Sequence, residues 1–581
     1  MNGLDYIVLG FYLLGILFVG MLFTRKNKSS ADMFAAGGQS PWWTSGLSGF
    51  MTMFSANTFV VWGGIAYKYG MAAVAINLMY GVAALLVGYF VAGKWKKIGI
   101  KSPAEFIQLR YGNKALHFYT WFMMTFRMVG TAGSLYALGT IFTALLTNGD
   151  YSLSALNIAI IIFGGIVVLY TMFGGLWAVL MTDTLQFILL NLAVLFVVPL
   201  AFMKVGGVGE FINKAPENFF LPVGGSYTWF FLAGWCVIHF FMIGAEWAFV
   251  QRFICVPSAK EAKKSSYLFG ILYLVSPLLW LLPPMLWRVQ SPIPEGATEQ
   301  EIRVLSENAY ILSCKSVLPV GMVGLMVAAM FSATASMVSS QLNVFSGVLT
   351  NDIYRPLRGG KLSDSQMVWA GRYFTILLGA VLVGIAISIP YLGGAEKVII
   401  SITELMVVAL LAPTLWGLFS KKINSFAVWI TASTGFISGC IVRFGLSPEG
   451  FLSGFEPLSG LSSWVGSHST ETKTFTGVLL PVITLAVIQM FSRKRSEGYD
   501  KIQALEAEED KLKRSGAVKA SSLPAIIVAW SLAVCGLLML VLSFFGKESS
   551  GVILTFALTL FAISGFIVIG ISRMSKKGKI G

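Results

Sequence analysis

Charged residues are scarce in this chain. They make up 12% of its 581 residues, whereas hydrophobic residues make up 56%. Soluble proteins carry about 25% charged residues, and a soluble chain this apolar would expose surface that water does not tolerate. The composition therefore excludes a soluble globular protein and predicts a protein that crosses a membrane many times.

Cysteine and histidine are also rare, with five and three copies. No C-x-x-C pair occurs, so the sequence predicts neither a disulfide scaffold nor a zinc site. The stretch GYFVAGK at 88–94 resembles a phosphate-binding loop, but Trp95 follows where serine or threonine is required. No catalytic motif is found, and we predict neither an enzyme nor an organic cofactor.

Long apolar runs are abundant. A helix needs about 20 apolar residues to cross the hydrocarbon core, and about fifteen segments of the chain qualify. No segment has the two-residue period of a strand, so an all-α membrane protein is expected. The first run, 4–24, has no basic start and no cleavage site, which indicates a retained span and not a signal peptide.

The net charge of +15 has an explanation in topology. Most of the 42 lysine and arginine residues fall in the loops of one side, among them those from Arg252 to Lys264. The positive-inside rule then places the N-terminus outside and the C-terminus in the cytoplasm, in an inner (plasma) membrane. Nucleic acid is excluded as a partner.

Two spans look interrupted near their middle. The second carries Ser55, Asn57 and Thr58 at mid-membrane, and the seventh carries Gly244 and Glu246. Five spans separate their starts, which is typical of two inverted repeats with a binding site at the midplane. Close packing of helices at small residues is the alternative explanation.

Few charges lie inside the spans, and such charges are usually functional. They are Arg127, Asp183, Glu246 and Glu404. The ninth span is rich in hydroxyls that mostly share one helical face. Its polar residues are Ser332, Ser336, Ser339, Ser340 and Asn343. Such oxygens suit a weakly held cation such as sodium, and Asp183 could supply a negative ligand.

Several motifs resemble those of the sodium/solute symporter family. YTMFGGLWAVLMTDTLQ at 170–186 is similar to the family signature, and ADMFAAGGQSPWW at 31–43 to the approach to its first core helix. Three stretches are similar to its cytoplasmic loops: SPAEFIQLRYG at 102–112, VQRFICVPSAKEAKKS at 250–265 and LTNDIYRP at 349–356. The motifs keep the family order from about residue 4 to 493.

The resemblance implies a LeuT-type fold, in which one extra N-terminal helix precedes two inverted repeats of five helices. It also implies a sodium site made of the backbone carbonyls of Met51, Phe54 and Ala333 and of two hydroxyls. Ser336 supplies one hydroxyl, but Met337 stands at the other position. A thioether is a poor ligand for a hard cation.

Some family members have a second sodium site. The resemblance places it at Asp183, Ser336, Ser339 and Ser340, all of which are present. Sodium is therefore the expected coupling ion, and proton coupling and uncoupled transport are the alternatives.

The resemblance puts the solute between the two broken helices. The candidate residues are Ser55, Asn57, Thr58, Asn77, Arg127, Glu246, Tyr273 and Thr403. Sugar transporters of the family have other residues in place of Glu246, Tyr273 and Thr403, which weakens a hexose assignment. Arg127 matches an arginine that receives the substrate carboxylate in sialic acid transporters, and a guanidinium fits a carboxylate well. Internal pairing of Arg127 with Glu246 or Asp183 is the alternative.

We therefore predict a sodium symporter that imports a small polar solute, with a carboxylate-bearing sugar or an organic acid favoured. A neutral sugar symporter and a non-transporting solute sensor are the alternatives. The expected partners are the solute and the lipid bilayer, with a monomeric transport unit. The expected segments are an extra helix and loop (1–43), two repeats (44–210 and 227–420), further family helices (421–493), a charged linker (494–520) and a C-terminal hairpin (521–581).

Overall fold

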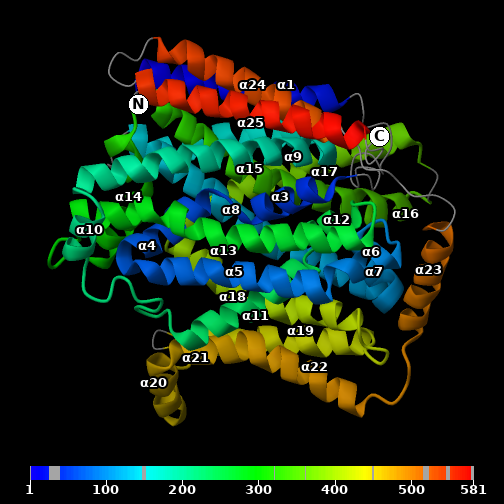
Figure 1. Cartoon of the computed structure of the whole chain (residues 1–581). Coiled ribbons are helices and arrows are strands. Elements are labelled where there is room, and N and C mark those ends of the chain that lie inside the picture. Colours follow the sequence, from blue (N-terminus) through cyan, green and yellow to red (C-terminus); the bar gives the residue numbers. More distant parts are fainter. Residues whose placement is uncertain are drawn as a thin grey trace.

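The fold is helical throughout the part of the chain that the computed structural model describes (Figure 1). That part comprises residues 2–24, 40–146, 152–319, 321–359, 362–447, 450–513, 523–544 and 550–576. Within these ranges no strand occurs, and only an isolated bridge joins Gly224 to Tyr227. The prediction of an all-α protein is confirmed.

Eleven helical segments of the described chain are long and apolar enough to span a membrane, and one bent pair of helices makes a twelfth. The helices concerned are α5 (Met71–Phe90), α8 (Asn113–Leu146), α9 (Leu153–Val205), α13 (Ala259–Gln290), α15 (Met322–Val348), α17 (Asp364–Ser388), α18 (Ala395–Gly417), α19 (Ser425–Cys440), α22 (Leu480–Phe491) and α25 (Ser550–Lys576). The protein is thus multi-pass, and the number of fifteen stays a prediction. The sequence predicts two separate spans between residues 153 and 203. In the structure one continuous helix, α9, contains two apolar segments of membrane length.

The first interrupted span is broken where the sequence predicts. Helix α3 (Trp42–Met53) is followed by Phe54, whose backbone is extended with φ −89° and ψ 129°. The chain then resumes in a π-helical turn, η2 (Thr58–Trp62), and in α4 (Gly63–Tyr69). The break frees backbone polar groups in the interior of the bundle, where they are available to a ligand.

The second interrupted span is also confirmed. Helix α11 (Trp229–Ala245) and helix α12 (Trp247–Ile254) meet at an angle of 52°. Glu246 is the residue at the break, with an extended backbone of φ −70° and ψ 137°. Its carboxylate is therefore placed by the break itself at the middle of the span.

Shorter helices connect the spans. They are α6 (Ala92–Ile98), α7 (Pro103–Tyr111), α10 (Val208–Lys214), α14 (Glu299–Val317), α16 (Arg355–Leu357), α20 (Ser459–Ser467), α21 (Ser469–Thr474) and α23 (Glu497–Lys513). Helix α14 is too polar for the span count and escaped the sequence analysis. Its start is marked by a capping box between Thr298 and Glu301, a local signal that the sequence does contain.

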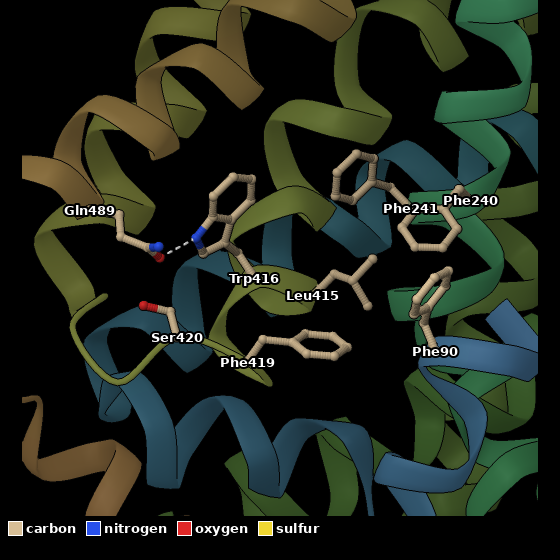
Figure 2. A pocket seen from close by; sticks show the side chains of 8 residues that line it. All are labelled: Phe90, Phe240, Phe241, Leu415, Trp416, Phe419, Ser420 and Gln489. Carbon is tan, nitrogen blue, oxygen red and sulfur yellow. Dashed lines mark hydrogen bonds between the residues drawn. The ribbon is translucent and has the colours of Figure 1, made fainter. Parts of the chain in front are cut away.

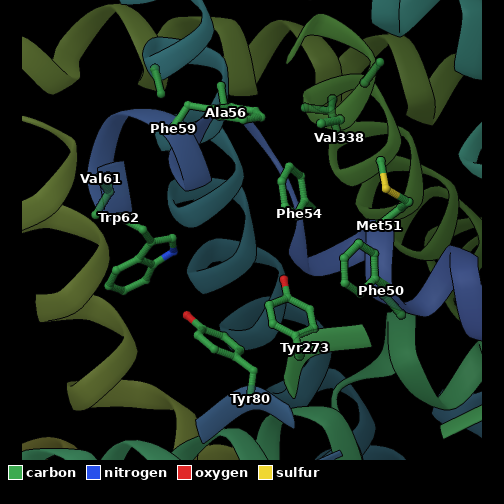
Figure 3. Packing of buried hydrophobic residues seen from close by; sticks show 14 of the residues in the cluster. Phe50, Met51, Phe54, Ala56, Phe59, Val61, Trp62, Tyr80, Tyr273 and Val338 are labelled. Carbon is green, nitrogen blue, oxygen red and sulfur yellow. The ribbon is translucent and has the colours of Figure 1, made fainter. Parts of the chain in front are cut away.

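Aromatic side chains fill the space beside the break in the first span (Figure 3). Phe50 and Phe54, on either side of the end of α3, pack on Trp280 with ring centroids 5.3 and 4.2 Å away. The centroid of the Tyr273 ring lies 4.8 Å from that of Phe50 and 5.2 Å from that of Tyr80. Helix α13 therefore supports the broken helix through its rings.

The C-terminal part attaches to the bundle at two places. Helix α23 of the predicted linker packs on α7, where Arg110 donates to the Ser496 hydroxyl at 2.7 Å and to the Ser420 carbonyl at 2.9 Å. Helices α24 (Leu523–Ser543) and α25 pair with each other, and α24 packs on α9. Residues 514–522 of the predicted linker and hairpin lie outside the described residues.

Candidate functional site

Helix α15 carries the predicted ion ligands and lies at the centre of the bundle. Every one of its residues from Met322 to Val348 is buried. It meets the broken span directly, because the backbone N–H of Ala56 donates to the Thr334 hydroxyl at 2.9 Å. The serines predicted from the sequence are thus out of reach of lipid and face other helices.

Asp183 and Ser336 lie together on one side of α15. Asp183, on α9, is fully buried and is in electrostatic contact with the Ser336 hydroxyl. One carboxylate oxygen, Oδ1, and the Ser336 hydroxyl make no hydrogen bond within the described chain. A buried carboxylate and a neighbouring buried hydroxyl with lone pairs left unused fit a small cation. Ser339 instead donates to the Ser336 carbonyl at 3.1 Å.

An arginine that the sequence analysis assigned to a cytoplasmic loop belongs to this cluster. Arg252, near the end of α12, is 1% exposed. Its Nη2 donates to the Ser340 hydroxyl at 2.6 Å, and its Nε donates to the Ser48 hydroxyl at 3.2 Å. Ser48 in turn donates to Asp183. The only signal in the sequence was its place directly after a broken span.

Met337, the residue that departs from the family pattern of the sodium site, contacts helix α8. The Met337 sulfur accepts a hydrogen bond of 3.1 Å from Ser134 on α8. Ser134 also accepts from the Ser55 hydroxyl at 3.1 Å and from the Asn57 amide at 2.6 Å. Ser134 therefore links Met337 on α15 to Ser55 and Asn57 of the broken span.

The backbone carbonyls assigned to the other sodium site belong to the end of α3 and to α15. The Met51 carbonyl accepts the Phe54 N–H at 3.2 Å, at the point where α3 ends. Ala333 is buried on α15, next to Thr334, which contacts the broken span. Thr58 is buried as well, and its hydroxyl accepts from the Ser55 N–H at 3.4 Å.

A buried ion pair lies further along the contact of α8 with α15. Arg127 Nε is 3.5 Å from Glu246 Oε1, and the two side chains are 4% and 0% exposed. With the Gln341 amide turned so that its oxygen faces the guanidinium, Arg127 Nη2 also donates to it at 2.8 Å. Gln341 was missed by the sequence analysis. Seven residues separate Arg127 from Ser134, about 10 Å along α8.

Within the described residues, no hydrogen bond joins the remaining candidates to these clusters. Asn77 donates to the Ala73 carbonyl of its own helix at 2.9 Å. Tyr273 belongs to the aromatic packing of Figure 3, beside Tyr80. Thr403 is buried on α18. Their predicted contacts with the solute stay predictions.

The comparisons with known proteins now decide the family. A model described as the sodium:solute symporter family matches residues 33–434. The chain belongs to the sodium:solute symporter family. Its helices are those of a sodium-coupled transporter of small solutes, which confirms the predicted class and the prediction that sodium is the coupling ion.

Individual relatives cover most of this symporter. It is 28% identical over 525 residues to the sodium/sialic acid symporter NanT of Aliivibrio fischeri, covering 87% of this chain and 97% of the relative. It is 26% identical to the sodium/glucose cotransporter of Vibrio parahaemolyticus (78% and 86% covered). It is 27% identical to the sodium/sialic acid symporter SiaT of Proteus mirabilis (76% and 90% covered).

A solved structure confirms the fold. The symporter superposes with a TM-score of 0.66 on a substrate-bound, outward-open Na+-coupled sialic acid symporter. The two chains are 23% identical, and the match covers 84% of this chain and 98% of the other. The predicted LeuT-type fold is thus confirmed.

One ion pair and two hydrogen bonds join helices near the end of α4 in the symporter. Lys68, at the end of α4, pairs with Glu396 at the start of α18 at 2.9 Å, and the Tyr227 hydroxyl donates to Glu396 at 2.9 Å. Glu307 of α14 accepts from the Tyr136 hydroxyl at 3.4 Å. Burial raises the pKa of Glu307 to about 7. The negative charge of Glu396 also raises this pKa, whereas the positive charges of Arg303 and Lys68 lower it.

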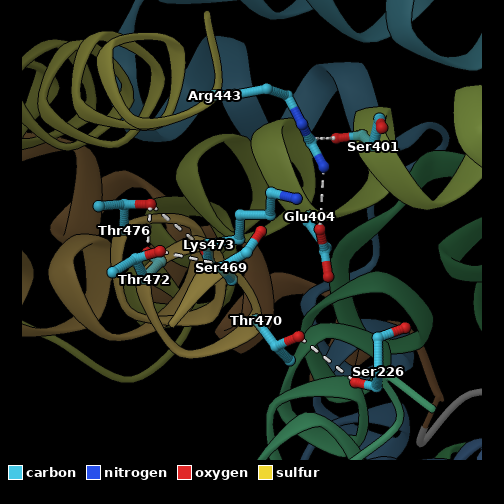
Figure 4. A network of polar contacts seen from close by, with 9 residues as sticks. All are labelled: Ser226, Ser401, Glu404, Arg443, Ser469, Thr470, Thr472, Lys473 and Thr476. Atoms are coloured by element: carbon cyan, nitrogen blue, oxygen red, sulfur yellow. Dashed lines mark hydrogen bonds and ion pairs between the residues drawn. The ribbon is translucent and has the colours of Figure 1, made fainter. Parts of the chain in front are cut away.

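Glu404 has a partner of its own in the symporter (Figure 4). Arg443 donates to Glu404 at 3.1 Å and also to the Ser401 carbonyl. The pair joins α18 to the π-helical turn η5 (Ile441–Gly445) that follows α19. Glu404 is thus held by a structural contact, away from the ion cluster.

A cavity lies apart from the predicted site (Figure 2). It has a volume of 440 Å³ and is mostly apolar, between α5, α11, α18 and α22. Its polar end is a hydrogen bond of 2.6 Å from the Trp416 indole to Gln489. None of the residues expected to bind ion or solute lines it.

Proposed function

We propose that this symporter imports an acidic sugar of the sialic acid type together with sodium. The observation that carries the proposal is Arg127, a buried guanidinium in the interior of the bundle. A buried arginine is costly in a membrane protein and is retained where it binds an anion. Two of the relatives described above transport sialic acid by name, which supports the same class of solute.

The contact of Arg127 with Glu246 is suited to exchange. At 3.5 Å it is longer than a tight charge-assisted hydrogen bond of about 2.8 Å. A solute carboxylate that reached Arg127 would replace Glu246, while Gln341 would keep its contact. Ser55, Asn57 and Thr58 would bind sugar hydroxyls from the break in the first span, and Asn77, Tyr273 and Thr403 are the other proposed contacts.

Sodium is proposed to bind at Asp183 and Ser336, with Ser339 and Ser340 as further ligands. Asp183 Oδ1 and the Ser336 oxygen support this assignment, because both are buried side by side and have lone pairs left for a cation. The carbonyls of Met51, Phe54 and Ala333 are proposed to hold a second ion with fewer oxygens, since the Met337 sulfur is engaged by Ser134. Sodium would then bridge the helices that must move apart for release.

Uptake by the purified protein in proteoliposomes tests the proposal. Labelled N-acetylneuraminate should accumulate under an inward sodium gradient, and glucose should accumulate much less. Accumulation of glucose instead would establish the neutral sugar alternative. Binding of either solute without accumulation would establish the sensor, and uptake that needs a proton gradient but no sodium would refute sodium coupling.

Two matched variants locate the solute carboxylate. Arg127→Lys keeps the charge but loses the fork that a carboxylate fits, and it should raise the half-saturating concentration of N-acetylneuraminate about tenfold or more. Arg443→Lys makes the same exchange at another arginine–glutamate pair and should leave that concentration unchanged. Equal effects of both variants would refute the assigned role of Arg127.

The protein is further proposed to lie in the inner (plasma) membrane with its N-terminus outside and its C-terminus in the cytoplasm. The distribution of basic residues supports this orientation. A monomer is the proposed transport unit. Protease access to tags at the two termini in right-side-out vesicles tests the orientation.

A further inference from the structure

Arg252 is a cation in the place where a cation is expected to bind. It belongs to α12, the second half of the broken seventh span, and its side chain is almost fully buried. A buried charge is tolerated only where paired charges or hydrogen bonds compensate it. The partners of this guanidinium therefore indicate what it does.

Those partners are the groups of the proposed ion site. Nη2 donates to Ser340 of α15 at 2.6 Å, and Nε donates to Ser48 of α3 at 3.2 Å. Ser48 donates to Asp183 of α9, so a single hydroxyl links the guanidinium to the carboxylate. Through Arg252 the broken seventh span thus holds three other helices.

The same oxygens serve the guanidinium and the proposed sodium ion. Ser340 is an expected sodium ligand, yet in this structure its hydroxyl accepts from Arg252. A sodium ion at Ser340 and Asp183 would stand close to the guanidinium in a region of low dielectric, where two positive charges repel strongly. Occupation by one cation therefore disfavours the other.

Arg252 also has a second set of contacts. Its Nη1 donates to the Ala248 carbonyl and to the Gln251 side chain, each at 3.1 Å, and both acceptors belong to α12. These contacts stay with the helix if the guanidinium leaves Ser48 and Ser340. The arginine can therefore give up the ion site without losing all its hydrogen bonds.

We propose that Arg252 is a tethered competitor of sodium. In the absence of sodium it binds Ser340 and, through Ser48, Asp183, and holds α12 against α3, α9 and α15. Sodium binding displaces it and releases α12 from these helices. By reciprocity, the return of Arg252 lowers the affinity for sodium and favours its release. The inference rests on the proposed site at Asp183, and it adds the residue that sets the affinity of that site.

A sodium titration of the purified, full-length protein tests the inference without transport. Thermal stability is measured as sodium replaces choline at constant ionic strength. Arg252→Gln removes the competitor and its charge, and the half-saturating sodium concentration should fall about tenfold, because a hydrogen bond to a charged group is worth that much in affinity. The stabilisation by saturating sodium should increase, since Asp183 is then buried without a cation.

A conservative variant and a control accompany it. Arg252→Lys keeps the charge but cannot reach Ser48 and Ser340 together, so a smaller fall of the half-saturating concentration is expected. This variant also serves if Arg252→Gln fails to fold. Arg443→Gln removes an arginine from a different carboxylate, Glu404, and should leave the sodium dependence unchanged.

The outcomes separate the inference from the proposal on which it rests. Asp183→Asn should abolish the sodium-dependent stabilisation, and its persistence would refute the ion site and the inference together. If Asp183→Asn behaves as expected but the Arg252 variants keep or raise the half-saturating concentration, only the competition is refuted. Arg252 would then be a structural anchor, and its replacement would lower stability equally at all sodium concentrations.

Discussion

Replacing Asp5 should destabilise the helix that carries the ion ligands. Asp5 lies on α1 (Gly3–Thr24), yet its Oδ1 accepts from the backbone N–H groups of Gly321 and Gly324 at 2.8 and 3.0 Å. Both N–H groups lie at the start of α15, where they have no acceptor within the helix, and α15 is the most buried span of the described chain. Asp5 is 2% exposed, and its carboxylate caps the positive end of the helix dipole.

The size of the effect follows from these contacts. A hydrogen bond to a charged acceptor contributes about 1.5–3 kcal/mol, and the charge at the helix end adds up to about 1 kcal/mol. Because such terms are not additive, Asp5→Ala should lower the free energy of unfolding by about 3 kcal/mol. Asp5→Asn keeps an acceptor oxygen and should cost only about 1 kcal/mol.

Unfolding by sodium dodecyl sulfate in mixed micelles, followed by tryptophan fluorescence, measures these differences. Glu210→Ala is the control, because Glu210 pairs with Lys214 at 2.8 Å while both side chains are about half exposed. Such a surface pair contributes at most about 0.5 kcal/mol. An Asp5→Ala variant as stable as this control would refute the claim that α1 caps α15.

Three further changes test other parts of the molecule. Glu307 has a raised pKa, so the wild type should lose stability as the pH rises from about 4.5 to about 7, and Glu307→Gln should remove this loss in thermal unfolding at pH 5 and pH 8. A Cβ on Gly477 would lie 2.1 Å from a backbone oxygen of α18, so Gly477→Ala should cost about 2 kcal/mol in the same micelle assay, whereas Gly551→Ala, with open space around it, should be neutral. Glu246→Gln leaves Arg127 without its carboxylate and should lower stability by about 3 kcal/mol, and N-acetylneuraminate should restore more of it than in the wild type, as thermal shifts would report.

The sequence determined the class of the protein and much of its arrangement of membrane helices. Apolar runs of membrane length can only become helices in a bilayer, because every backbone polar group must be satisfied within its own segment. The breaks at Phe54 and Glu246 were predicted because polar residues and glycines interrupt these runs at mid-span. The sequence motifs alone indicated the family, without any tertiary contact.

Local sequence was a poorer guide to the partners of each polar group. Ser336 and Asp183 were predicted to share a site from the resemblance, and the structure brings them together. Arg252 was counted among loop charges, because nothing in its neighbours along the chain tells that α12 turns its guanidinium inward. Gln341 carried no signal, since a single amide in a span fits many helix contacts.

The scarcity of charge decided the class at once, but tertiary structure alone decided what the few buried charges do. Arg127 could have been free for a solute, yet the angle between α11 and α12 places Glu246 beside it. Arg252 could have faced water, yet the packing of α12 against α3 and α15 gives it Ser48 and Ser340. Composition limits how many charges enter the membrane, whereas their pairing depends on helices far apart in the chain, which only folding brings into contact.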